Sequence, residues 1–284
     1  MVISASRRTD IPCYYSDWFF NRIKAGFLCT RNPMNPNQIK RIELTPEVID
    51  CIFFWTKDPE PMLSRLSELD KAGYMYYFQF TITPYGKDIE KNLRNKNDII
   101  HTFAELSKQI GKNRVIWRYD PVIINEEINT EYHRINFDHL CDMLSPYTES
   151  VTISFVDMYE KIKNRNITEI SPDKIDELGL LFSGISGNYG LSINSCCEAA
   201  DLKKFGIKQA SCIDGALIRK LTDTEIPLKR DKNQRASCGC MESTDIGAYN
   251  TCGNGCIYCY ANNSEKSVIN RISRHDPERE FLLR

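Results

Sequence analysis

Three cysteines near the C-terminus have the spacing of a metal-cluster loop. Cys252, Cys256 and Cys259 follow the pattern C-x3-C-x2-C, and two glycines lie inside the first interval. Three thiolates this close can converge on one iron–sulfur cluster, and the glycines allow the backbone to wrap around it. A cube of four irons held by only three cysteines leaves one iron free to bind another molecule. The spacing therefore predicts a [4Fe–4S] cluster with one open iron.

A second group of cysteines precedes this loop. Cys212, Cys238 and Cys240, together with Cys196 or its neighbour Cys197, supply four thiolates. These four could close around an auxiliary [4Fe–4S] cluster. Zinc stays open as the alternative, because structural zinc sites are held by four sulfur or nitrogen ligands.

The remaining cysteines and the histidines show no ligand pattern. Cys13, Cys29, Cys51 and Cys141 lie scattered in apolar or helical contexts, where free cysteine behaves as a small buried hydrophobe. The four histidines are not spaced as ligands, and the sequence contains no Ser–His–Asp arrangement or phosphate-binding glycine loop. The two cysteine groups are therefore the main chemical signal of the chain.

Short apolar runs alternate with segments of helical periodicity, and this alternation predicts the fold that must position the cysteines. The run 51–55 is continuously apolar, as in strands covered on both faces. Such alternation predicts a parallel sheet with crossover helices. The predicted strands are 2–6, 49–55, 76–83, 114–119, 150–155, 191–194, 207–210 and 245–249. The predicted helices are 16–25, 61–71, 96–110, 135–144 and 172–186.

Eight strands in 284 residues predict a single α/β domain, a (βα)8-like or partial TIM-type barrel. Residues 1–225 would form the barrel body. Residues 226–284 would be a cysteine-rich segment that completes the barrel and carries the cluster loop. Polar residues crowd just beyond the C-terminal ends of the strands, at the rim where barrels build their sites.

Basic residues at this rim form a candidate anion site. Guanidinium groups bind carboxylate or phosphate through two parallel hydrogen bonds. The alternative is that these residues form structural ion pairs with nearby aspartates. The basic residues are Arg7, Arg8, Lys57 and Arg118, and the aspartates are Asp10, Asp58 and Asp120.

Net charge and the lack of targeting signals limit the cellular locations and partners that the sequence predicts. A formal net charge of −1 gives no whole-chain field for holding nucleic acid or a membrane surface. The apolar runs are too short to span a bilayer, and charge arrives too early at the N-terminus for a signal peptide. We therefore expect a cytoplasmic protein with no membrane partner, whose contact with nucleic acid through a local patch stays open.

The loop resembles the signature of the radical S-adenosylmethionine superfamily, C-x3-C-x-aromatic-C, with Tyr258 at the aromatic position. The resemblance implies an enzyme whose [4Fe–4S] cluster binds S-adenosyl-L-methionine and generates a 5′-deoxyadenosyl radical. It also implies an electron donor such as ferredoxin or flavodoxin. Tyr258, Arg7, Arg118 and Glu198 are the residues expected to bind the cofactor. The substrate stays unknown.

More of the chain resembles an uncharacterised bacterial family of cysteine-rich proteins, a domain of unknown function. The likeness implies Cys196 rather than Cys197 as the ligand, because the family usually keeps a cysteine two places before the glutamate, here Glu198. The segments that carry it are 3–12, 31–33, 117–121 and 245–250.

The position of the loop departs from the superfamily pattern, in which the three cysteines follow the first barrel strand. Here they follow the last one. In a closed barrel the eighth strand lies beside the first, and both loops emerge on the same rim. The sequence therefore predicts a circularly permuted barrel. Two other classes stay open: a zinc-stabilised binding module, with nucleic acid as the candidate partner, and a non-catalytic iron–sulfur electron carrier or sensor.

Overall fold

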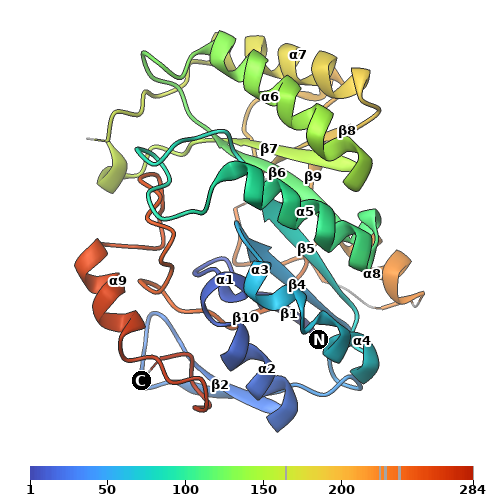
Figure 1. Ribbon diagram of the computed structural model, residues 1–284, viewed down its shortest axis with the longest axis vertical. Helices are drawn as coiled ribbons and strands as arrows, with labels where there is room; N and C mark the ends of the chain where they lie inside the picture. The colour runs from blue at the N-terminus through green and yellow to red at the C-terminus, as the bar shows by residue number, and fades with distance from the viewer. Residues whose placement is uncertain (164, 224, 227–228, 236–237, 284) are drawn as a thin grey trace.

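The computed structural model describes residues 1–163, 165–223, 225–226, 229–235 and 238–283, and is built on one eight-stranded sheet (Figure 1). Every strand pair in this sheet is parallel. The strands are β1 (Val2–Ala5), β4 (Cys51–Thr56), β5 (Tyr76–Thr81), β6 (Val115–Val122), β7 (Ser150–Phe155), β8 (Ser192–Cys196), β9 (Lys208–Ala210) and β10 (Thr244–Asp245). All eight predicted strands are thus present, and the prediction of a parallel α/β fold is confirmed.

The strand order is β10-β1-β4-β5-β6-β7-β8-β9. The last strand therefore lies beside the first, as the sequence predicts, with Ser4 opposite Asp245. Strands β9 and β10 form the two edges, and no pairing between them closes the sheet within the described residues. The prediction that β10 runs to residue 249 is wrong, because the Asp245 carboxylate accepts a hydrogen bond from the Gly247 amide at 3.0 Å and turns the chain.

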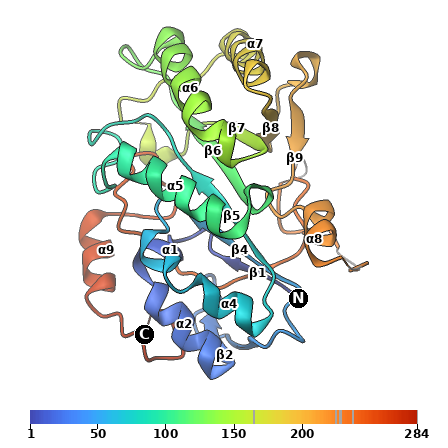
Figure 2. The same ribbon diagram turned by 45° about the vertical axis from the view of Figure 1, so that its right-hand side comes forward.

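Helices cover the outer face of the sheet (Figure 2). They are α1 (Ile11–Tyr14), α2 (Ser16–Ala25), α3 (Glu60–Leu63), α4 (Leu66–Ala72), α5 (Lys96–Ile110), α6 (Thr130–Leu144) and α7 (Pro172–Asn188). Two further helices lie elsewhere: α8 (Gly215–Thr222) packs through Ile218 in the cluster of Cys51, Phe53 and Cys212, and α9 (Glu265–Ile272) belongs to the C-terminal segment. Short 3-10 turns occupy Lys112–Arg114, Ser145–Tyr147, Glu160–Ile162 and Lys203–Phe205. The predicted helices 16–25 and 96–110 have the observed bounds, whereas 61–71 is broken into α3 and α4.

Strand side chains alternate between two cores, as the period of a strand requires. Ile52 and Phe54 of β4 face outward and pack under the helices in the main apolar core. Cys51 and Phe53 of the same strand face the inside of the curved sheet, in a smaller cluster that also contains Cys212. Three of the four cysteines predicted to be core thiols, Cys29, Cys51 and Cys141, are buried. Cys13 is half-buried.

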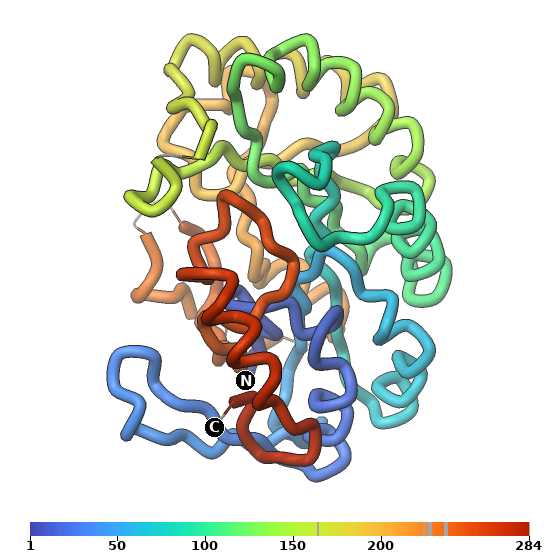
Figure 3. Tube along the Cα trace, turned by 60° about the vertical axis from the view of Figure 1, so that its left-hand side comes forward, coloured from blue at the N-terminus to red at the C-terminus, as the bar shows by residue number. Residues whose placement is uncertain are grey.

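The C-terminal segment runs back across the N-terminal segment (Figure 3). The Tyr15 hydroxyl donates to the Thr251 carbonyl at 2.6 Å, and the Trp18 indole donates to the Arg279 carbonyl at 2.9 Å. An antiparallel hairpin of β2 (Phe27–Arg31) and β3 (Ile39–Glu43) lies outside the main sheet and was not predicted. No helix in the described part of the chain is both long and apolar enough to cross a membrane.

Candidate functional site

The C-x3-C-x2-C loop is bound to the segments that follow β1 and β5. Asn254 lies inside the loop, and its amide donates to Asp10 Oδ2 at 3.2 Å while its carbonyl Oδ1 accepts from the Tyr14 hydroxyl at 2.9 Å. The Asn92 amide donates to the Asn254 backbone carbonyl at 3.1 Å. These contacts place the three cysteines at the end of the sheet where β1 and β4 finish.

The glycines of the loop are required by close packing. A Cβ on Gly253 would lie 2.7 Å from the ring of Tyr14. Gly255 has φ +68°, and a Cβ there would lie 2.9 Å from Asn92 Nδ2. Only glycine avoids a clash at the first position and strain at the second. The two glycines noted in the sequence thus let the loop lie against the protein, close to Asp10.

The thiols of Cys252 and Cys256 lie close enough to the neighbouring thiols of the loop to be affected by their charge. Burial, with the nearby Asp10 carboxylate and the other two thiols, raises the pKa of Cys252 well above its ordinary value. Burial also raises the pKa of Cys256 to about 12, against the charge of Lys57. Metal binding at this loop must therefore displace protons, as thiolate ligation generally does.

The second group of cysteines meets inside the curved sheet, near the ends of β8 and β9. The sulfurs of Cys196 and Cys212 lie 3.0 Å apart, and the Ile213 amide donates to Cys240 Sγ at 3.5 Å. Cys238 is buried in the same cluster. The structure thus brings together Cys196, Cys212, Cys238 and Cys240, and Cys197 packs against the same cluster.

The pKa values within this second group are split. A hydrogen bond from the Cys212 thiol, helped by the charge of Arg118, lowers the pKa of Cys196 to about 6. A hydrogen bond from Cys212 likewise lowers the pKa of Cys240 to about 5. The pKa of Cys212 is raised well above normal because its thiol serves both neighbours. The Cys212 thiol has one hydrogen and can donate to only one of them at a time, so it favours a thiolate at Cys196 or at Cys240.

The spacing of the cysteines in each group favours some kinds of metal site over others. No three His, Cys, Asp or Glu side chains of the described residues converge closely enough to hold one metal ion. In a [4Fe–4S] cube each thiolate binds a different iron, so its ligands do not have to meet at one point. Thiol ligands without nearby histidine are typical of iron–sulfur clusters and soft metals.

Three rim side chains lie beside the second group of cysteines: Arg7 after β1, Trp55 in β4, and Arg118 in β6. The Arg118 guanidinium lies 4.9 Å from the Trp55 ring centroid, and that of Arg7 lies 5.8 Å from it. Arg118 donates to Asp120 Oδ2 at 2.5 Å, to Gln79 Oε1 at 3.3 Å and to Cys212 Sγ at 3.0 Å. The alternative prediction of a structural ion pair is thus confirmed for Arg118 and Asp120.

A buried ion-pair network around Glu90 also supports the C-x3-C-x2-C loop, through Tyr258. Glu90 is fully buried and pairs with Lys57 Nζ at 2.8 Å and with Lys96. The Tyr258 hydroxyl also donates to Glu90. Burial raises the pKa of Glu90, but the charges of Lys57 and Lys96 outweigh it and hold the pKa at about 2.

Asp10 connects the strands to the loop. Its carboxylate accepts hydrogen bonds from the Thr56 hydroxyl at 2.7 Å, the Lys57 amide at 2.8 Å and the Cys13 amide at 3.1 Å. Burial raises the pKa of Asp10 to about 6 despite these hydrogen bonds. Asp10 therefore fixes α1, the end of β4 and, through Asn254, the cysteine loop to one another.

Glu198 lies at the end of β7. Its Oε1 accepts from the Ser154 hydroxyl and the Phe155 amide, both at 2.9 Å. Burial raises the pKa of Glu198 to about 7. Of the residues expected to bind S-adenosylmethionine, Tyr258 belongs to the C-x3-C-x2-C loop, whereas Arg7, Arg118 and Glu198 lie beside the second cysteine group. Their role with the cofactor stays a prediction.

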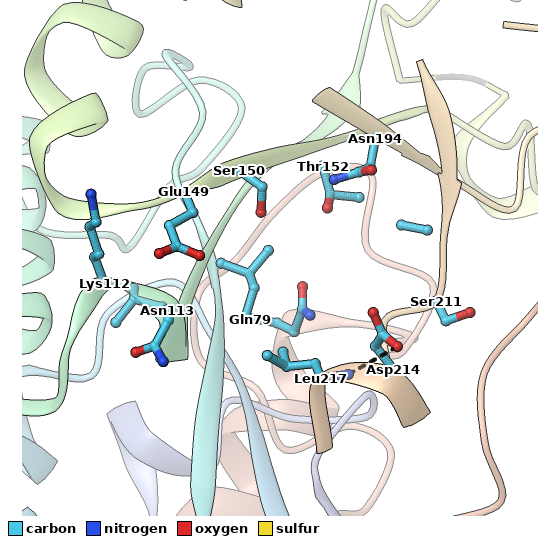
Figure 4. Close-up of a pocket in the computed structure, with 13 residues that line it drawn as sticks. Gln79, Lys112, Asn113, Glu149, Ser150, Thr152, Asn194, Ser211, Asp214 and Leu217 are labelled. Carbon is cyan, nitrogen blue, oxygen red and sulfur yellow. Dashed lines mark hydrogen bonds between the residues drawn. The ribbon is translucent and has the colours of Figure 1, made fainter. Parts of the chain in front are cut away.

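A polar cavity of about 160 Å³ extends from Gln79 toward the start of β7 (Figure 4). Thr152 and Asn194 line it from inside the sheet, and Asp214 and Leu217 line it from the start of α8. Gln79 also donates to the Cys212 carbonyl at 3.1 Å. The cavity therefore lies next to the second cysteine group and away from the C-x3-C-x2-C loop.

Some residues of the site carry no sequence signal that would have revealed them. Glu90 and Lys96 lie in or just after the connection between β5 and α5, where no periodic pattern applies. Trp55 was included only as the last residue of a predicted strand. A buried carboxylate that pairs with lysines from two segments can be recognised only once those segments are placed in space.

The comparisons with known proteins add a family but no activity. The sequence model of a family described as "Domain of unknown function (DUF1848)" matches residues 2–261. No curated protein matches the sequence. One similar solved structure is a putative alpha-L-fucosidase from Bacteroides thetaiotaomicron, with 12% identity and a TM-score of 0.32. The match covers 62% of this chain and 83% of that one.

Proposed function

Because the chain belongs to the DUF1848 family, whose activity is not known, we propose a function from its cysteines: a radical S-adenosylmethionine enzyme with a [4Fe–4S] cluster on Cys252, Cys256 and Cys259. The observation that carries the proposal is the grouping of these three thiols at the end of β1 and β4. The thiols of Cys256 and Cys259 help to raise the pKa of Cys252, and that of Cys259 helps to raise the pKa of Cys256, as closely placed thiols do.

The residues around the loop fit such a group. The donor set consists of three thiols with no competing histidine. Asn262 Nδ2 donates to the Cys252 carbonyl at 2.8 Å, while the buried Asn262 Oδ1 has no partner among the described residues. A buried acceptor without a donor suits the amino group of a bound molecule. When bound, the cluster supplies the electron that cleaves S-adenosylmethionine into methionine and a 5′-deoxyadenosyl radical.

The protein's part in this chemistry is placement and exclusion of water. The Glu90 network holds Tyr258, and Asp10 holds Asn254, so both halves of the loop are fixed to the sheet. The Tyr85 ring lies 6.4 Å from that of Tyr258 and helps cover the loop. A fixed and covered loop limits the escape of a reactive radical.

The permuted barrel belongs to the same proposal. Strand β10 pairs in parallel with β1 and leads into the cysteine loop; in the proposed permutation it would correspond to the superfamily's first strand. The second cysteine group would hold an auxiliary [4Fe–4S] cluster, with zinc as the alternative. A ferredoxin or flavodoxin would deliver the electron.

The test is anaerobic reconstitution followed by iron analysis and a search for 5′-deoxyadenosine. Two cubes give about eight irons per chain, and replacing Cys252, Cys256 and Cys259 together by alanine should leave about four and no 5′-deoxyadenosine. Cys29→Ala, buried in the outer hairpin, is the matched control and should retain all the iron. A colourless protein that binds zinc would favour the zinc module, and eight irons without 5′-deoxyadenosine would favour an electron carrier or sensor.

A further inference from the structure

The Arg7 side chain is a cation without an ion pair. Its backbone is fixed, since the amide donates to Asp245 Oδ2 at 2.9 Å and the carbonyl accepts from the Tyr260 hydroxyl at 2.7 Å. Its guanidinium makes no hydrogen bond and no salt bridge with any residue in the described part of the chain. The side chain is only half-buried, so a molecule can reach it from the rim.

The Trp55 indole beside it is a donor without an acceptor. Nε1 of Trp55 is buried and has no hydrogen-bond partner among the residues that the structure describes. The Arg7 guanidinium carbon lies 5.8 Å from the centre of the Trp55 ring. An unpaired buried donor is destabilising and calls for an acceptor that the protein itself does not provide. Arg7 and Trp55 are thus neighbours, one with a charge outside any ion pair and the other with an N–H group outside any hydrogen bond among the described residues.

The second cysteine group does not account for this pair. Arg118 already serves as its cation, because its guanidinium is buried and bonded to Cys212 Sγ at 3.0 Å and to Asp120. Arg7 makes no such bond, although the charges of these thiols and of Asp245 act on it from nearby. The guanidinium of Arg118 is therefore fully hydrogen-bonded within the protein, whereas that of Arg7 is not.

We propose that Arg7 and Trp55 bind an oxyanion of the substrate, a carboxylate or a phosphate. The planar guanidinium matches both groups, and the indole N–H supplies a further hydrogen bond to the same oxygen atoms. Calling the bound molecule the substrate rests on the proposed function, whereas oxyanion binding itself does not. Because the Arg7 backbone bonds to Tyr260, which follows Cys259, and its guanidinium is affected by the charges of Cys240 and Cys212, the proposed site lies between the two cysteine groups.

The test titrates the reconstituted protein with inorganic phosphate and, separately, with acetate at constant ionic strength. Affinity is measured by calorimetry and by the rise of the melting temperature. Arg7→Gln should weaken binding at least about tenfold, and Trp55→Phe, which keeps a ring but loses the N–H, by several-fold. Arg7→Lys keeps the charge without the fork and should fall between wild type and Arg7→Gln. The anion that binds more tightly identifies the source of the oxyanion.

The neighbouring arginine provides the matched control. Arg8 Nη1 lies 4.0 Å from Asp245 and 3.5 Å from the Gly247 carbonyl, so the protein already uses it. Arg8→Gln should leave anion affinity within about twofold of wild type. Equal losses in Arg7→Gln and Arg8→Gln, or no loss in Arg7→Gln, overturn the proposal.

A parallel titration with S-adenosylmethionine separates this site from the cofactor. If Arg7→Gln loses affinity for S-adenosylmethionine and keeps it for both anions, Arg7 belongs to the cofactor and the proposal is overturned. If wild-type protein forms no 5′-deoxyadenosine, the proposed function fails. A selective loss of anion affinity in Arg7→Gln and Trp55→Phe still establishes the oxyanion site in that case.

Discussion

The cysteines of the second group occupy different electrostatic environments although their side chains lie together. The pKa of Cys196 falls to about 6 and that of Cys240 to about 5, mainly through hydrogen bonds from Cys212. Burial raises the pKa of Cys238 to about 11. A thiolate at Cys196 or at Cys240 is therefore favoured, and a metal that binds at this group would displace the protons of the remaining thiols.

Replacing Cys238 and Cys240 by alanine tests this second group directly. The double variant should lose about four of eight irons and melt at a lower temperature, because metal-binding energy is partly folding energy. Iron analysis and calorimetry measure the two effects. Cys141→Ala, a buried thiol of α6 far from either group, serves as the control, since it removes a thiol without touching a ligand. Full iron and an unchanged melting temperature in the double variant would exclude these residues as ligands.

A buried histidine in α6 makes the stability of the chain depend on pH. His133 is fully buried, with Nε2 2.9 Å from the Ile123 carbonyl and Nδ1 2.7 Å from the Tyr119 hydroxyl. Because the carbonyl can only accept, Nε2 carries the hydrogen, and Nδ1 accepts from the hydroxyl. Burial lowers the pKa of His133 from 6.5 to about 4, so the folded state keeps the ring neutral.

The sign of the pH effect follows from this lowered pKa. The unfolded chain binds a proton at His133 below about pH 6.5, and the folded chain does so only near pH 4. The stability that neutral His133 contributes is therefore present above pH 6.5 and is lost as the pH falls toward 4. Between pH 7.5 and 5 the loss amounts to roughly 2 kcal/mol.

Urea unfolding of wild type and His133→Gln at pH 7.5 and pH 5 measures the effect. The glutamine variant is less stable at both pH values, but its loss between them should be smaller than that of wild type by roughly 2 kcal/mol. His101→Gln, at an exposed position of α5, should show the wild-type dependence. An equal pH dependence in wild type and His133→Gln would contradict the assignment.

At the scale of elements, the connection between β5 and α5 is held by charges in place of a regular structure. Its Glu90 side chain is fully buried and joins Lys57, at the end of β4, to Lys96, at the start of α5. The Ile257 amide of the cysteine loop donates to the Ile89 carbonyl at 3.0 Å, next to this carboxylate. The ion pairs therefore fix the position of both connections at once.

Glu90→Gln should lower the free energy of unfolding by about 3 kcal/mol, because removing one partner leaves buried lysine charges uncompensated. Chemical unfolding at neutral pH measures the change. The control is Glu265→Gln, which breaks the exposed pair with Lys91 at 2.8 Å and should cost less than about 1 kcal/mol. Similar small losses in both variants would show that the Glu90 network is not structural.

The strands could be predicted from the sequence because each is a short apolar run between polar segments. The apolar run 51–55, for example, predicts β4. The prediction that the last strand lies beside the first is confirmed by the pairing of β10 with β1. The hairpin of β2 and β3 was missed because β3 is largely exposed and polar. Its pairing depends on backbone hydrogen bonds, which leave no hydrophobic pattern.

The cysteine groups could be predicted from spacing and order, whereas their surroundings could not. The contact of Cys196 with Cys212 joins two strand ends that the predicted sheet already placed together. Arg118 bonds to Asp120 and Cys212, whereas Arg7 has no ion pair among the described residues. This difference depends on the direction in which each side chain points. Sequence pattern fixes the face of a strand but not which of several neighbours a long side chain reaches.

At the scale of the molecule, the C-terminal segment holds together parts of the chain that are distant in sequence. Residues 250–260 contact α1 through Tyr14 and the β5–α5 connection through Asn92. In metal-free protein this segment is held by a few hydrogen bonds around thiols that burial keeps protonated. A cluster bound to Cys252, Cys256 and Cys259 would hold the loop together with much stronger bonds. Cluster binding should therefore raise the local stability mainly in this segment.

Hydrogen exchange of cluster-loaded and chelator-treated protein tests this coupling. Removal of the cluster should speed exchange at the Asn92, Ile257 and Cys259 amides by at least about tenfold, because each bonds to or within the loop and opens when the loop loosens. Amides of β5 and β6, which are paired in the sheet, should keep their rates. The variant lacking the three loop cysteines should show the chelated pattern without chelator. Faster exchange throughout the sheet would mean that the metal holds the whole fold together. Unchanged exchange in the loop would mean that these cysteines bind no cluster, since a loop that loses three metal bonds cannot keep its local stability.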